Sequence, residues 1–193
     1  MTVFLAKGYL EGQNLLDAEA LVAQVTADNA DLAFLVGASY LRTGEYEKGK
    51  ALMTEVLDKG FDRMVSFWGD AEKLRTLAAS EMAYHAGIGG DSKVILWMEE
   101  RLGRDLVTDQ LLVRDGKGLL AGKTKLRDVL RFHKARAFHN EEETAKAKEV
   151  LAELSFASGK IFVDGEVQGL RDAVARLQAQ VDGVARLIGA LFA

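Results

Sequence analysis

Apolar residues recur at spacings of three and four along most of the chain, which is the periodicity of amphipathic helices. Short turn-forming stretches interrupt this periodicity, such as Thr43-Gly44-Glu45 and Lys59-Gly60. Helices of about twelve to fifteen residues that are joined by turns this short lie antiparallel to each other. Residues 1–60 therefore predict two helical hairpins, and the chain as a whole predicts an all-α fold.

The apolar pattern of the first hairpin returns 31 residues later. Small residues then correspond to small ones and large apolar residues to large apolar ones, in the pairs Ala6/Gly37, Tyr9/Tyr40, Leu10/Leu41, Leu15/Tyr46, Ala18/Gly49, Leu21/Leu52, Val22/Met53 and Val25/Val56. A small residue on one helix lets its partner helix approach closely, and large apolar residues fill the seam. Such an internal period indicates a helical-repeat architecture.

The second copy, Ala30 to Phe61, resembles the tetratricopeptide repeat. Gly37 and Tyr40 match the small and aromatic residues of that family's first helix, and Gly49 stands where its second helix carries a small residue. The resemblance implies a right-handed array of helical hairpins, an α-solenoid. The departures from the family pattern are Ala27 in place of the proline between repeats and Ala33 in place of a common Trp.

The resemblance also implies a binding surface. In this family the first helix of each repeat lines a concave groove that takes a protein or peptide partner. The corresponding positions of the second copy are Asp31, Phe34, Ala38, Leu41 and Arg42. Leu35 stands where members that clamp a C-terminal carboxylate have Asn, so this clamp is not implied. Phe34 and Leu41 either contact a partner or are covered by a neighbouring hairpin or the C-terminal helix.

Beyond Phe61 the repeat fades, and the pattern predicts a third, divergent hairpin. Its helices are expected near residues 70–87 and 92–102, with Asp91 or Ser92 as the N-cap of the second. Residues 104–122 read as an insertion, either an irregular loop or a β-hairpin near 110–121 turned by Asp115-Gly116. The predicted organisation is helical repeats over 1–103, this insertion, and C-terminal helices over 123–193.

The C-terminal region predicts three helices. Two are expected over about 123–138 and from Asn140 to about 157, the second begun by the capping-box pair Asn140 and Glu143. The third covers residues 166–192, where apolar residues form a strict heptad seam. The seam consists of Val167, Leu170, Val174, Leu177, Val181, Val184, Ile188 and Leu191. Because glycines weaken this helix, it needs a partner surface, and it either docks on its own chain or pairs with another subunit.

Composition narrows the range of functions. The chain has 193 residues, a net charge of −4 and no cysteine. The lack of cysteine excludes a disulfide scaffold, a thiolate metal site and a cysteine nucleophile. The acidic balance argues against nucleic acid or an anionic membrane as a partner. No apolar stretch is long enough for a signal-peptide core or a membrane-spanning helix, so we expect a cytoplasmic protein.

Few patterns point to catalysis or cofactor chemistry. The stretch from Gly116 to Thr124 resembles a phosphate-binding P-loop, but Lys117 occupies the position where the motif needs its first glycine. His133 and His139 are too far apart round a helix to share a metal ion on one face. We therefore expect neither a metal site nor a cofactor.

Basic residues gather on one predicted helix. Arg127, Arg131 and Lys134 lie on nearly one face of the helix that is expected from about residue 123. This face is either a solvated surface or a docking site for an acidic partner segment or a phosphate backbone.

These features favour a non-catalytic adaptor, chaperone or assembly scaffold that binds a protein or peptide partner. The first alternative is a self-assembling structural subunit, a homo-oligomer formed through the C-terminal heptad helix. The second alternative is an enzyme with a carboxylate-based site, because Asp and Glu number 29 and no spacing singles out a pair.

Overall fold

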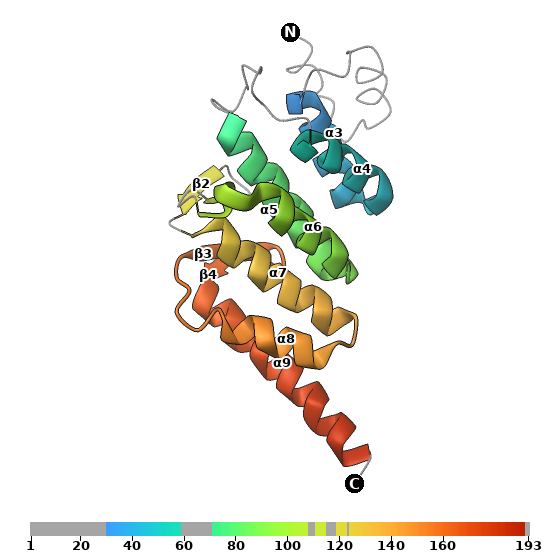
Figure 1. Ribbon diagram of the computed structural model, residues 1–193, viewed down its shortest axis with the longest axis vertical. Helices are drawn as coiled ribbons and strands as arrows, with labels where there is room; N and C mark the ends of the chain where they lie inside the picture. Colours follow the sequence, from blue (N-terminus) through green and yellow to red (C-terminus); the bar gives the residue numbers. More distant parts are fainter. Residues whose placement is uncertain (1–29, 59–70, 108–110, 115–118, 123, 192–193) are drawn as a thin grey trace. The chain divides into compact units, whose positions relative to one another are not determined.

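A computed structural model of the chain describes residues 30–58, 71–107, 111–114, 119–122 and 124–191, which are mostly helical (Figure 1). The chain divides into two compact units, Met1–Met82 and Ala83–Ala193. The first copy of the predicted repeat, at residues 6–25, lies outside the described residues.

The described part of the first unit contains a helical hairpin. Helices α3 (Ala30–Thr43) and α4 (Tyr46–Asp58) pack against each other, which confirms the hairpin predicted for the second copy. Gly44 makes the turn possible because its φ of 88° lies in the left-handed region that favours glycine. The Glu45 amide donates to the carbonyl of Tyr40 at 2.9 Å and closes the end of α3.

Two glycines stand where α3 and α4 meet. A Cβ added to Gly49 would lie 2.6 Å from Cγ of Leu41 and 2.9 Å from the backbone oxygen of Gly37. A Cβ added to Gly37 would lie 3.2 Å from Cβ of Leu52. The small residues therefore allow the close approach that the repeat pattern predicts for these two helices.

Helix α7 is at the centre of the second unit. This unit contains the end of α5 (Ala71–Gly89), then α6 (Ser92–Leu102), the short 3-10 helix η1 (Gly103–Val107), α7 (Leu126–Asn140), α8 (Thr144–Ala152) and α9 (Leu170–Leu191). Helix α7 packs on α6, α8 and α9, and Figure 1 shows it between α6 and α8. Its interior residues include Leu130, Phe132 and Ala135, so the core of the unit forms around it.

The structure contains two β-hairpins. Strands β1 (Leu111–Arg114) and β2 (Leu119–Gly122) pair antiparallel, so of the two alternatives considered near residues 110–121, a loop or a β-hairpin, the β-hairpin is present. Strands β3 (Lys160–Val163) and β4 (Glu166–Gly169) form a second antiparallel pair. Asp164 and Gly165 join them with φ values of 53° and 86°, the conformation of a two-residue hairpin turn.

The second hairpin corrects the start of the predicted heptad helix. Residues 166–169 form β4, so the helix begins at Leu170 and not at 166. Val167, the first residue of the predicted seam, is paired with Phe162 on the neighbouring strand. The physical reason is the Asp164-Gly165 turn, which reverses the chain and brings residues 166–169 alongside β3.

The predicted capping box at Asn140 is also wrong. Asn140 is the last residue of α7, and Glu143 is the N-cap of α8 without a capping hydrogen bond from its side chain. The Asn140 side chain instead donates from Nδ2 to the carbonyls of Gly87 at 2.9 Å and Ile88 at 3.1 Å. Helix α8 ends at Ala152, earlier than the expected 157.

The predicted third hairpin has the expected helix boundaries to within two residues. Helix α5 ends at Gly89 and α6 covers Ser92–Leu102. Asp91 is the N-cap of α6, and its side chain accepts a hydrogen bond from the amide of Val94. The sequence therefore located the break, and of its two cap candidates, Asp91 and Ser92, the N-cap is Asp91.

The glycine contact between α3 and α4 predicts the effect of adding one methyl group. We expect Gly49→Ala to lower the free energy of unfolding by about 1–2 kcal/mol, because overpacking costs more than the about 1 kcal/mol that alanine gains in helix propensity. Gly183 in α9 has no atom within 4 Å of an added Cβ, so Gly183→Ala is the matched control and is expected to stabilise the protein. Urea denaturation followed by circular dichroism measures both, and equal stabilisation by the two variants would contradict the close contact.

Candidate functional site

The residues predicted to line a groove on α3 are mostly interior. The side chains of Phe34, Ala38 and Leu41 are buried, and Leu41 lies against Gly49 of α4. Arg42 pairs through Nε with Oε1 of Glu81 at 2.6 Å, and nothing is described of the Asp31 side chain. Phe34, Ala38 and Leu41 are therefore covered by other residues of their own chain, which is the second of the two alternatives given for Phe34 and Leu41.

The heptad seam of α9 divides into two halves. In the first half Leu170, Leu177 and Val181 are buried against their own chain, where α9 packs on α8, α7, β3 and β4, and Val174 is partly exposed. In the second half Val184 is partly exposed and Leu187, just beside the seam, is 69% exposed. Figure 1 shows this second half extending past the N-terminal end of α8. The side chains of Ile188 and Leu191 lie outside the described residues.

A polar contact marks the boundary between the two halves of α9. Asp182 accepts a hydrogen bond from Gln178 at 3.0 Å and forms an ion pair of 2.7 Å with Lys148 of α8. The hydrogen bond from Lys148, followed by that from Gln178, lowers the pKa of the Asp182 carboxyl below its usual value. This contact is the last one toward the C-terminus that the structure describes between the charged side chains of α8 and α9.

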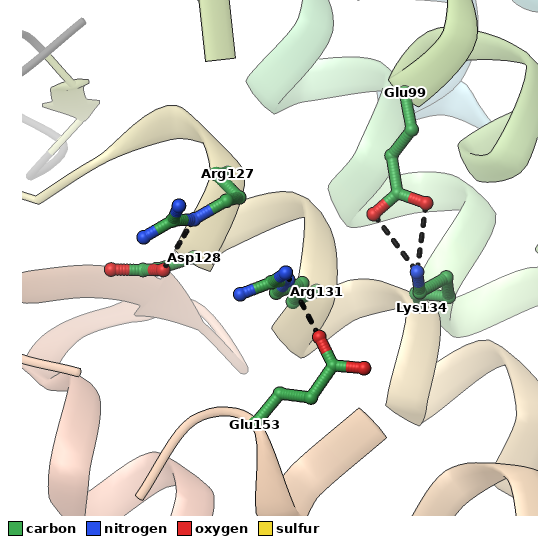
Figure 2. A network of polar contacts seen from close by, with 6 residues as sticks. All are labelled: Glu99, Arg127, Asp128, Arg131, Lys134 and Glu153. Carbon is green, nitrogen blue, oxygen red and sulfur yellow. Dashed lines mark hydrogen bonds and ion pairs between the residues drawn. The ribbon is translucent and has the colours of Figure 1, made fainter. Parts of the chain in front are cut away.

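The basic face predicted for α7 exists, and each of its three cations has a carboxylate partner in the same chain. Lys134 contacts both carboxylate oxygens of Glu99 on α6, at 2.9 and 2.7 Å, and Arg131 pairs with Glu153 after α8 at 2.9 Å. Arg127 lies 3.5 Å from Asp128. Figure 2 shows the three cations along α7 with these partners around them. Lys134 and Arg131 therefore join α7 to neighbouring elements, and the charge of the basic face is largely neutralised within the chain.

His133 is buried on another side of α7, among aromatic and basic groups. Its side chain is 1% exposed, and the ring lies edge-on to those of Tyr84 at 5.7 Å and Phe132 at 5.3 Å. Burial, followed by the charges of Arg136 and His85, lowers the pKa of His133 to about 3. Position 133 continues the apolar stripe of α7 from Val129 and Leu130, which is the signal in the sequence for a core histidine.

Among the described residues, no group of three or more His, Cys, Asp or Glu side chains is arranged to hold a metal ion. In that part of the chain, no helix combines the length and the apolar character needed to cross a membrane.

Comparisons with protein-family models, with curated proteins and with solved structures found no match for this chain.

The partly buried pair of Lys134 and Glu99 predicts a measurable coupling. In a double-mutant cycle with Lys134→Met and Glu99→Gln, we expect an interaction energy of about 1 kcal/mol or more, because removing one partner leaves the other charge in a poorly solvated site. The control is the exposed pair of Lys48 and Glu45, 3.6 Å apart, for which about 0–0.5 kcal/mol is expected. Urea denaturation gives both energies, and equal coupling in the two pairs would contradict the stronger interaction expected between α6 and α7.

Proposed function

We propose that this protein is a non-catalytic assembly scaffold that binds another protein chain through the C-terminal half of α9. The observation that carries the proposal is the change in burial along α9, where the seam residue Val181 is fully buried and Leu187, just beside the seam, is 69% exposed. The apolar residues of α9 continue past the part of the helix that α8, α7 and the β3–β4 hairpin cover. Such a helix end is suited to packing against a partner helix or into a partner's groove.

The chemistry of this helix end favours an apolar partner surface. From Gly183 to Leu191 the sequence contains one charged residue, Arg186, whose Nε donates to the carbonyl of Asp182 within α9. An apolar seam with little charge gains binding energy from burial and sets few electrostatic requirements on its partner.

The first unit supports the same class of function. Helices α3 and α4 lie within the segment that resembles a tetratricopeptide repeat, and Gly37 and Gly49 allow the close approach of the two helices. We propose that they form one hairpin of a helical array, an architecture that commonly serves protein binding. We favour α9 over the first helix of this hairpin as the binding surface, because Phe34, Ala38 and Leu41 are buried.

A self-assembling subunit is the second candidate, and the same part of α9 favours it. An apolar helix face with few charges can pack on a copy of itself about a two-fold axis. The two candidates share the contact made by Leu187 and differ in the identity of the chain that covers it.

Replacing Leu187 tests the proposed surface. We expect Leu187→Glu to weaken association by about 30-fold or more, since a charge in an apolar interface costs about 2 kcal/mol or more. The helix should be unaffected in circular dichroism because this side chain is already exposed. Deleting α9 is a poorer test, because Leu170, Leu177 and Val181 belong to the core.

The matched control is Leu96→Glu, because Leu96 is a 42% exposed leucine on α6. Sedimentation velocity over a concentration series measures self-association, and quantitative capture with each variant as bait measures association with another protein. Loss in Leu187→Glu alone supports the proposal. Equal association by both variants, or a full-length chain that is monomeric and captures nothing, contradicts it.

A further inference from the structure

The end of α5 is held on α7 around His133. A Cβ added to Gly87 would lie 3.0 Å from the backbone oxygen of His133 and 3.2 Å from its Nδ1, so the two backbones approach closely here. One turn before Gly87, the ring of Tyr84 contacts the His133 ring and also Phe162 of β3. The imidazole therefore lies inside the contact between α5, α7 and the β3–β4 hairpin.

The contact between α5 and α7 offers no acceptor to Nδ1 of His133. Among the described residues this nitrogen is buried without a hydrogen-bond partner, and a Cβ added to Gly87 would lie 3.2 Å from it, so the end of α5 packs closely on this side of the ring. A charged imidazolium needs acceptors for both of its N–H groups, and burying it without them is costly.

The surrounding charges also oppose protonation. The titratable and charged groups around the ring are Tyr84 and His85 on α5 and Arg136 on α7. Asp164 on the β3–β4 turn acts through its 2.6 Å ion pair with Arg136. Arg136 and His85 both disfavour a positive charge on His133. Asp164 is mostly exposed and already engaged with the guanidinium.

We propose that His133 makes the contact between the end of α5 and α7 acid-sensitive, so that proton uptake releases the segment from Ala83 to Asp91 from α7. Two hydrogen-bonded contacts that also hold this segment contain no histidine: Asn140 donates to the carbonyls of Gly87 and Ile88, and Glu141 accepts from the amide and hydroxyl of Ser92 at 2.8 and 2.7 Å. His85, within the segment, contacts the ring of Tyr84, and its contribution is distinguished from that of His133 by the control variant below. Imidazole titrates in mild acid, above the range in which carboxylates titrate.

The direction of the effect follows from the pKa of His133 in two states of the contact. In the closed state the end of α5 packs on α7, and in the open state it is released and the ring is solvated. In the closed state the pKa of His133 is about 3, against an ordinary value of 6.5 when the ring is solvated. The closed contact is therefore fully stable above about pH 6.5 and loses stability as the pH falls below that value. Between about pH 7 and about pH 5 the population of the open state should rise about 25-fold, because only the open state binds the proton.

Hydrogen exchange at single-residue resolution tests the proposal on the full chain. Protection factors, corrected for the intrinsic pH dependence of exchange, are compared at about pH 7 and about pH 5. Amides near the end of α5 should lose about 25-fold in protection, and amides in the middle of α8, such as Val150, should change little. In His133→Gln the loss should disappear. In the controls His85→Gln and His139→Gln it should remain.

A second measurement covers the case in which His133→Gln does not fold. In the wild-type chain, the imidazole resonances of His133 should show no titration of the closed state above about pH 5, whereas the protection near Gly87 still falls. The proposal is overturned if His133 titrates near its ordinary pKa in the folded chain. It is also overturned if protection near Gly87 is independent of pH, or if His85→Gln and not His133→Gln removes the dependence.

Discussion

Burial of the first half of α9 against α8, α7 and the β3–β4 hairpin anchors the C-terminal part of the second unit. Leu170, Leu177 and Val181 fill this contact, and Lys148 and Asp182 close it at its far end. Helix α8 begins at Thr144, so it offers no surface to cover the last turns of α9. The length of α8 thus determines where the seam changes from core to candidate binding surface.

Helix α7 is held by two kinds of contact that respond differently to solution conditions. Its charged side chains pair with Glu99 and Glu153 from the neighbouring elements, and these partly solvated pairs weaken with salt. Nδ1 of His133 has no hydrogen-bond partner among the described residues, and by the proposal above the contact around this ring weakens with acid. The end of α5 and the first half of α9 therefore pack on α7 through different contacts.

Local signals predicted most helices and one hairpin, and non-local contacts account for the errors. The alternatives considered for residues 110–121 and for the cap of the helix at 92–102 included β1–β2 and Asp91 because turn and cap chemistry is local. An Asp-Gly pair also stands at 164–165, but the heptad pattern predicted a helix from 166, because Val167 fits both a seam and a strand. Asn140 has the chemistry of a cap, but it bonds carbonyls more than 50 residues away in the chain. The carboxylate partners of the basic face and the burial of Phe34 likewise depend on packing that one segment does not encode.

The change from a buried first half to an exposed second half of α9 is tested most directly by the rates at which single thiols react in the two halves. The native chain has no cysteine, so Leu177→Cys and Leu187→Cys each place one reporter, the first in the buried half and the second in the exposed half. In a dilute sample the account predicts that the thiol at 187 reacts with a maleimide at the rate of a free thiol. The thiol at 177 should react at least about 100-fold more slowly, because it reacts only when the contact opens. Equal rates at the two positions would contradict the account.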